Sequence, residues 1–235
     1  MPLFTATDVP PEHVDPKMVD AANLFYDRLV ARKVDSFEIA EPRTGYRYSN
    51  LARAYMQSHV RRCLSFIDSG YAELQAGRLL PVYAASRSVL ETVAVMCDFV
   101  ATIAPPINNA NYMAAEELIA SRALATRIPS FAQKGEPLFA VQILNQIDKM
   151  DKRYPGYRDQ YDHLSDIAHP NALGAVVHFC NFDRDVAVFA DGINDESKAA
   201  VSLVLGAFKL GYAVVACEDL EPLLLKLSER APLSA

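Results

Sequence analysis

The chain has 235 residues, of which 51% are hydrophobic and 22% charged, and its formal net charge is −6 at pH 7. This composition excludes a disordered chain, and the content of only 9 glycines with no tryptophan argues against a turn-rich all-β protein. The negative charge excludes a surface that attracts nucleic acid over its whole extent, which leaves RNA binding to a local patch.

The first 15 residues predict an irregular arm, because Pro10 and Pro11 block a helix, and residues 16–235 predict a single helical domain. The N-terminal sequence has neither a basic region nor an apolar run, so we expect no signal peptide and a cytoplasmic location. The four cysteines lie far apart in the sequence, without metal-ligand spacing. We therefore expect reduced thiols and neither a metal nor any other cofactor.

From residue 16 onward, apolar residues recur at helical spacing between prolines and short polar loops. Residues 82–104 are apolar nearly all round the helix that they predict, so this helix should be central, and Pro105 should end it. Residues 199–217 are nearly long enough to span a bilayer, with Lys209 as the single charge. Because an amphipathic helical pattern continues beyond them, we expect a buried core helix and no membrane association.

The apolar period changes from helical to alternating in GAVVHFCNFDRDVAVFADG, residues 174–192. The alternation lies on both sides of a polar turn at residues 181–185, which predicts a β-hairpin near residues 175–190. A lone hairpin is only marginally stable in water, so we expect it to pack on the helices. The predicted fold class is therefore mainly all-α, a bundle of about seven helices with one inserted β-hairpin.

The stretch YRDQYDHLSDIAHPN, Tyr157 to Asn171, concentrates polar side chains in a short predicted helix. At ~100° per residue, one face of this helix carries Arg158, Tyr161, Asp162, Ser165 and His169. His163 points elsewhere, and Asn171 closes the stretch and is grouped with its polar residues. An imidazole can act as acid or base near neutral pH and an arginine can bind phosphate, so these residues fit metal-independent RNA cleavage. They also fit simple anion binding or a solvated helix end.

A second pair of polar residues lies on the most apolar predicted helix. Arg87 and Glu91 are four residues apart in SRSVLET. A charge at such a position is costly unless it is paired. The two residues either pair with each other or meet the polar face of residues 157–169, and in the second case they form a buried polar network of the kind that often marks a site.

Residues 158–163, RDQYDH, resemble the R-x4-H motif of HEPN nucleases, which are all-α proteins of bacterial defence and toxin–antitoxin systems. Arg87 and Glu91 form R-x3-E, and residues 161–170 form Y-x3-S-x3-H-P; together they are similar to motifs of uncharacterised bacterial HEPN-like proteins. The resemblance implies a helical bundle, a homodimer and ribonuclease activity. It implies that Arg158 and His163 are the catalytic pair, acting across the dimer interface. His169, with the R-x3-E pair, is the alternative catalytic centre.

Two functions follow from these observations. The first is a metal-independent endoribonuclease in bacterial phage defence or stress response, with Arg158 and one of the two histidines of the polar stretch as catalytic residues. The basic residues between 149 and 158 would then contact phosphates, while Tyr154 and Tyr157 would stack on bases. The second is a non-catalytic HEPN-like module that binds RNA, a nucleotide or a partner protein through the same polar residues.

Overall fold

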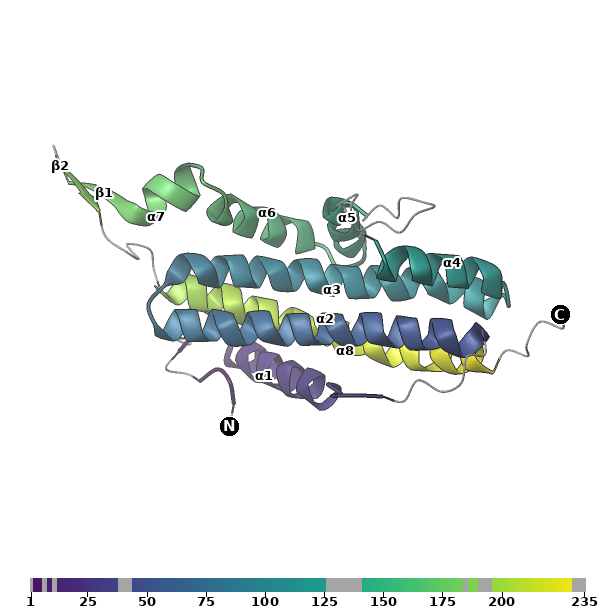
Figure 1. Cartoon of the computed structure of the whole chain (residues 1–235). Coiled ribbons are helices and arrows are strands. Elements are labelled where there is room, and N and C mark those ends of the chain that lie inside the picture. Colours follow the sequence, from purple (N-terminus) through teal and green to yellow (C-terminus); the bar gives the residue numbers. More distant parts are fainter. Residues whose placement is uncertain are drawn as a thin grey trace.

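The computed structural model describes residues 2–5, 8–9, 12–37, 44–125, 141–183, 186–189 and 196–229. These residues form eight α-helices, one π-helical segment and two strands (Figure 1). The helices are α1 (Pro16–Ala31), α2 (Thr44–Gln75), α3 (Leu79–Asn108), α4 (Tyr112–Ala123), α5 (Ile143–Arg153), α6 (Tyr157–Ala168), α7 (Val177–Phe179) and α8 (Glu196–Ser228). The π-helical segment η2 (Ala172–Val176) precedes α7, and the strands are β1 (Cys180–Asp183) and β2 (Val186–Phe189). The mainly all-α fold with one inserted hairpin is confirmed.

The long helices α2, α3 and α8 lie side by side, and α1 packs against α8 and α2 (Figure 1). Helices α4, α5 and α6 all pack on α3, which is therefore covered from two sides. Most of the buried apolar side chains on α3 and α8 form one continuous core with those of α2. Burial of this apolar surface is the main stabilising contribution to such a bundle. A polar residue on α3 must therefore be paired or must lie at a junction between the covering helices.

One proline marks where a helix begins, and another shows where the prediction of a helix end is wrong. Pro16 is the first residue of α1, where its missing N–H costs nothing, and the Asp15 carboxylate accepts a hydrogen bond from Lys17 N at 2.9 Å. Pro105, however, does not end α3, which continues to Asn108. The proline lies in the last turn of the helix, so the hydrogen bond that it cannot donate, to the carbonyl of Ala101, is lost only near the helix end.

The hairpin is present, but it is shorter than the alternating sequence that predicts it. Strands β1 and β2 pair antiparallel, with Cys180 opposite Phe189 and Asp183 opposite Val186. Residues 172–179 before them are helical, as η2 and α7. All four β2 residues are exposed, and the hairpin projects beyond the end of the bundle (Figure 1). The prediction that it packs on the helices of its own chain is therefore wrong, and its apolar side chains face outward.

Helices α3 and α8 are each long and apolar enough to cross a bilayer by length and composition. In each, more than half of the most apolar window is buried inside the bundle. Core helices of soluble bundles and membrane-spanning helices both meet this criterion.

Candidate functional site on helices α3 and α6

Helix α6 begins at a sharp turn that a carboxylate of α5 stabilises. Gly156, just before the helix, has a φ of 89°, a left-handed conformation that glycine adopts without strain. Asp151 Oδ1 accepts hydrogen bonds from the backbone N–H groups of Gly156 and Arg158, both at 3.0 Å. This carboxylate satisfies a first-turn donor and lies at the positive end of the helix dipole.

Two tyrosines near this turn anchor α5 and α6 to the bundle. Tyr157 is fully buried, and its hydroxyl donates to the carbonyl oxygen of Leu90 at 2.7 Å. Burial raises the pKa of Tyr157 well above its usual value, so the hydroxyl stays protonated and keeps this bond. Tyr154 stacks on Tyr212 of α8, with ring centroids 3.9 Å apart. Tyr157 is buried, so the prediction that it stacks on a base is wrong. Tyr154 is half-buried, and its stacking on a base stays a prediction.

Three polar side chains meet where α6 crosses α3, and we call them the α3–α6 cluster: Arg87, Glu91 and Tyr161. Arg87 Nε donates to Glu91 Oε1 at 3.1 Å, one helical turn further along α3. The Tyr161 hydroxyl accepts from Arg87 Nη2 at 3.2 Å and donates to Glu91 Oε1 at 3.1 Å. The Arg87 guanidinium also lies 5.3 Å from the centroid of the Tyr161 ring. The structure thus joins the pair on α3 to the polar face of α6.

The α3–α6 cluster lies at the edge of the core and is open to solvent. Tyr161 is only 3% exposed, whereas the side chains of Arg87 and Glu91 are 25% and 24% exposed. A buried phenol thus holds a cation and a carboxylate in fixed positions at the surface. A guanidinium can bind a phosphate and a carboxylate can accept a proton, so the cluster presents both groups to a ligand.

Arg158 does not join this cluster, although it lies on the same helix. Its Nη1 contacts Asp148 Oδ1 of α5 at 2.5 Å, and its Nε contacts Asp162 Oδ2 at 2.7 Å. Hydrogen bonds to Asp162 and Asp148 raise the pKa of Arg158 above its usual value. Asp162 is therefore the ion-pair partner of Arg158 and contacts neither Arg87 nor Glu91 through any hydrogen bond among the described residues.

The two histidines of the polar stretch are exposed and separate from the cluster. His163 is exposed on α6, and no hydrogen bond or ion pair among the described residues joins it to Arg158. His169 follows the last turn of α6, where its backbone N–H donates to Ser165 O at 3.0 Å. Eight residues separate it from Tyr161, or ~12 Å along the helix axis. One chain therefore does not bring either histidine to the α3–α6 cluster.

Asn171 has a structural role at the turn after α6. Its Nδ2 donates to Asp166 Oδ1 at 2.8 Å, and its Oδ1 accepts from Gly174 N at 3.0 Å. The second bond caps the first turn of η2, which is the ordinary role of an asparagine at this position. Asn171 thus belongs to the turn and not to the α3–α6 cluster.

Two polar atoms on α6 are buried without a hydrogen-bond partner among the described residues: Ser165 Oγ and Gln160 Nε2. Ser165 is one turn after Tyr161, on the polar face that the sequence predicts. A buried polar atom without a partner costs free energy, so such atoms are uncommon in folded proteins. Ser165 thus places a buried hydroxyl, without a partner among the described residues, one turn after Tyr161.

The sequence does not single out the carboxylate that ties three helices together, Asp98. It is almost fully buried on α3 and contacts Lys149 Nζ of α5 at 2.6 Å and Arg122 Nη2 of α4 at 3.1 Å. Gln146 Nε2 of α5 also donates to it, at 3.3 Å. Lys149 is therefore an ion-pair partner within the protein, and its contact with a phosphate stays a prediction. The only signal in the sequence for the ion pairs of Asp98 is that a charged residue stands within an apolar stretch.

Among the described residues, no group of three or more histidine, cysteine, aspartate or glutamate side chains could hold a metal ion. The fold and the α3–α6 cluster define an all-α bundle with an arginine–glutamate–tyrosine cluster at the surface of its central helix. No protein-family model, curated protein or solved structure matches the chain.

Proposed function

We propose that this chain is a HEPN-like, metal-independent endoribonuclease that acts in the bacterial cytoplasm, in defence or stress response. The observation that supports this proposal is the α3–α6 cluster, which presents a guanidinium and a carboxylate together at the surface. The resemblance of R-x3-E and Y-x3-S-x3-H-P to HEPN-like motifs supports it as well, because Arg87, Glu91 and Tyr161 are residues of these motifs.

The chemistry of RNA cleavage matches the groups that the cluster offers. Arg87 binds a non-bridging phosphate oxygen and stabilises the negative charge that grows on it. Glu91 accepts the proton of the ribose 2′-hydroxyl, whose oxygen attacks the phosphorus. The bond from phosphorus to the 5′ oxygen breaks, and that oxygen takes a proton from water. The products carry a 2′,3′-cyclic phosphate and a 5′-hydroxyl, and Tyr161 acts as a positioning residue because it is buried.

This assignment moves the reacting groups from the R-x4-H pair to α3. Two carboxylates hold the Arg158 guanidinium, and no contact joins it to His163 among the described residues. Exposed ion pairs are weak, so an RNA phosphate can displace Asp148 or Asp162 from Arg158. Arg158 then binds a neighbouring phosphate, and its loss weakens RNA binding more than it slows the chemical step.

The protein is proposed to act as a homodimer that forms through its hairpin. Phe182 and Phe189 are 69% and 75% exposed, and Val186 and Val188 on β2 are exposed too. The described sheet has only β1 and β2, so both of its outer edges are unpaired among the described residues. An exposed apolar sheet edge is a template for a further strand, and the same hairpin of a second copy can supply it.

The test is cleavage of mixed-sequence RNA in EDTA by wild type, Arg87→Gln and Glu91→Gln, with Glu73→Gln as the matched control. Glu73 lies on α2 and, like Glu91, forms an ion pair with an arginine, in this case Arg78. We expect Glu91→Gln to slow cleavage at least about a hundredfold, the usual contribution of a general base. Glu73→Gln should cleave as wild type does. If all these variants cleave equally, the α3–α6 cluster is not the active site. Arg158→Gln and His163→Gln are assayed in the same way, and loss of cleavage in these two variants alone assigns catalysis to the R-x4-H pair.

A second candidate is a non-catalytic module that binds RNA, a nucleotide or a partner protein. One observation favours it: the members of the α3–α6 cluster satisfy each other's hydrogen bonds, as in a fixed anion-binding site. Fluorescence anisotropy with labelled RNA and with nucleotides separates the two functions. Binding without cleavage by wild type, weakened in Arg87→Gln, supports this second candidate.

A further inference from the structure

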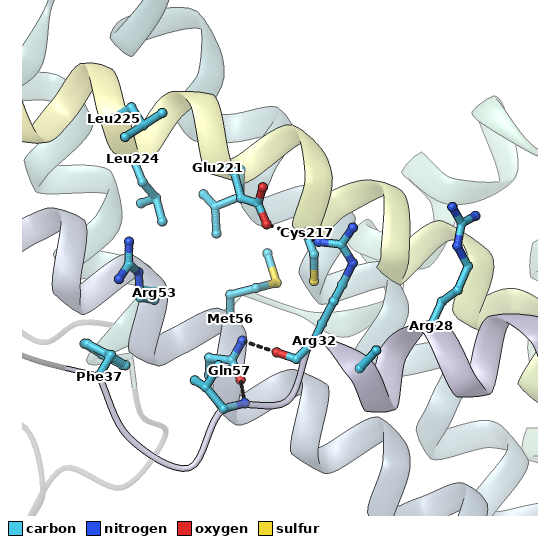
Figure 2. A pocket seen from close by; sticks show the side chains of 13 residues that line it. Arg28, Arg32, Phe37, Arg53, Met56, Gln57, Cys217, Glu221, Leu224 and Leu225 are labelled. Carbon is cyan, nitrogen blue, oxygen red and sulfur yellow. Dashed lines mark hydrogen bonds and ion pairs between the residues drawn. The ribbon is translucent and has the colours of Figure 1, made fainter.

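We propose that the cleft between α1, α2 and α8 binds a small amphipathic anion, with one carboxylate or phosphate group on an aliphatic or aryl body. The cleft has a volume of about 770 Å³, within the range of small-molecule sites. Its lining comes from α1 and the turn after it, from α2 and from the C-terminal half of α8 (Figure 2). None of the described lining residues belongs to α3 or α6, so this site is separate from the α3–α6 cluster.

The walls of the cleft are mainly apolar. Met56 of α2 and Leu224 of α8 face the same space, and Phe37 lies at its edge (Figure 2). Leu225 also lines the cleft and is largely exposed. Met56 and Leu224 are already buried, so an apolar ligand body would remove mainly Leu225 from water. Each square ångström of apolar area so removed contributes roughly 25 cal/mol.

Several polar groups in the cleft are already occupied by protein partners. The Gln57 amide accepts from Val34 N at 3.2 Å and donates to Arg32 O at 2.9 Å, which fixes the turn after α1. The Arg32 guanidinium contacts Glu221 at 3.1 Å and Glu218 at 2.6 Å. These groups have few hydrogen-bond donors or acceptors left for a ligand. The cleft therefore does not offer the pattern of donors and acceptors that would recognise a nucleobase.

Two guanidinium groups remain available to a ligand. Arg53 and Arg28 line the cleft, and neither has an ion pair with a described residue. Arg53 lies 5.5 Å from the centroid of the Phe37 ring, an arrangement that orients it without neutralising it. Two arginines without an ion-pair partner among the described residues lie beside an apolar cleft, in contrast with the net charge of −6. Arginine binds carboxylate and phosphate through paired hydrogen bonds, so the charge complements an anion and opposes a cation.

The test is isothermal titration calorimetry with four probes: dodecanoate, dodecyl phosphate, dodecyltrimethylammonium and inorganic phosphate, the first three below their micelle concentrations. We expect at least one anionic amphiphile to bind, while the cationic amphiphile and inorganic phosphate bind at least about tenfold more weakly. The difference between dodecanoate and dodecyl phosphate identifies the head group. Equal binding of the cationic amphiphile, or no binding of either anionic amphiphile, overturns the proposal.

Three variants locate the binding. Arg53→Gln should weaken binding about tenfold or more, because it removes a charge-assisted hydrogen bond. Arg47→Gln, an exposed arginine on the same helix outside the cleft, should bind as wild type does. Ala31→Trp places a large ring at an exposed lining position and should abolish binding while leaving the melting temperature nearly unchanged. Wild-type affinity in both Arg53→Gln and Ala31→Trp places the ligand elsewhere and contradicts the proposal.

Discussion

Arg87 and Glu91 occupy the most apolar helix of the chain, yet their side chains are not sealed in the core. The sequence predicts the pair, because residues four apart on a helix are neighbours. It also places Tyr161 on the polar face of α6, and that face meets α3 at this point. The partners of Arg158 could not be predicted in the same way, since Asp148 lies on α5 and its position depends on how two helices meet.

Gly174 is the residue at which we expect a single methyl group to be most costly. A Cβ at this position would lie 2.0 Å from the carbonyl oxygen of His169 and 2.3 Å from that of Ile167. These are backbone atoms, so relief requires the turn after α6 to move. We expect Gly174→Ala to lower the free energy of unfolding by about 1–3 kcal/mol, measured by urea denaturation.

Gly206 on α8 supplies the matched control. A Cβ there would have its nearest contact at 3.7 Å, with Ser86, which is ordinary van der Waals distance. Because alanine favours a helix interior over glycine, Gly206→Ala should be neutral or stabilising by about 0.5–1 kcal/mol. Equal destabilisation by the two substitutions would show that the backbone contact at Gly174 is not the cause.

At the level of elements, Asp98 holds α4 and α5 against α3. Removal of the carboxylate in Asp98→Ala leaves the mostly buried Arg122 without its partner. We expect a loss of about 3 kcal/mol in the free energy of unfolding, as for other broken buried ion pairs. Lys149→Gln should cost less than about 1 kcal/mol, because more than half of the lysine side chain is in solvent. Urea denaturation of both variants checks this order, and a larger loss in Lys149→Gln contradicts it.

The sequence correctly predicts that a hairpin forms, but it does not predict what the hairpin packs against. Alternation indicates strands, but residues 174–179 alternate as well and are helical, because Asn171 caps a helical turn there. Alternation also cannot tell whether the apolar side chains face the bundle of their own chain or another molecule. In this chain they face outward.

The exposed hairpin leads to a prediction about oligomeric state. Phe182→Ser with Phe189→Ser should convert a dimer to a monomer, because it removes the two largest exposed apolar side chains of the hairpin. The control is Leu24→Ser with Met113→Ser, which removes two exposed apolar side chains on α1 and α4. Light scattering coupled to size-exclusion chromatography gives the masses. A monomeric wild type, or a dimer that persists in the hairpin variant, contradicts the role of the hairpin.

For the whole molecule, the sequence predicts a helical bundle because apolar spacing is repeated in every long helix. It does not predict the cleft between α1, α2 and α8, since Arg28 and Arg53 come from separate helices and neither belongs to a local motif. Sites made by residues distant in sequence depend on helix packing, which a single sequence does not specify.

Stability should fall as the pH drops below about 6.5, the usual pKa of an unfolded histidine. Burial lowers the pKa of His59 and that of His178, so the unfolded chain takes up protons that the folded chain does not. We expect the melting temperature to fall between pH 7.5 and about 5.5, and His59→Gln to reduce this decrease. His163→Gln, at an exposed position, should leave it unchanged. If the melting temperature falls equally in wild type, His59→Gln and His163→Gln, His59 is excluded as a cause.

The central claim is that the α3–α6 cluster activates a ribose 2′-hydroxyl, and the chemistry of the products tests it most directly. Wild type is incubated in EDTA with mixed-sequence RNA and with the same RNA carrying 2′-O-methyl groups, and the product ends are identified by mass spectrometry. The account predicts cleavage of the unmodified RNA alone, with 2′,3′-cyclic phosphate and 5′-hydroxyl ends, and its loss in Glu91→Gln. Cleavage of the methylated RNA, 3′-hydroxyl ends, or no cleavage of either RNA by the folded dimer would contradict it.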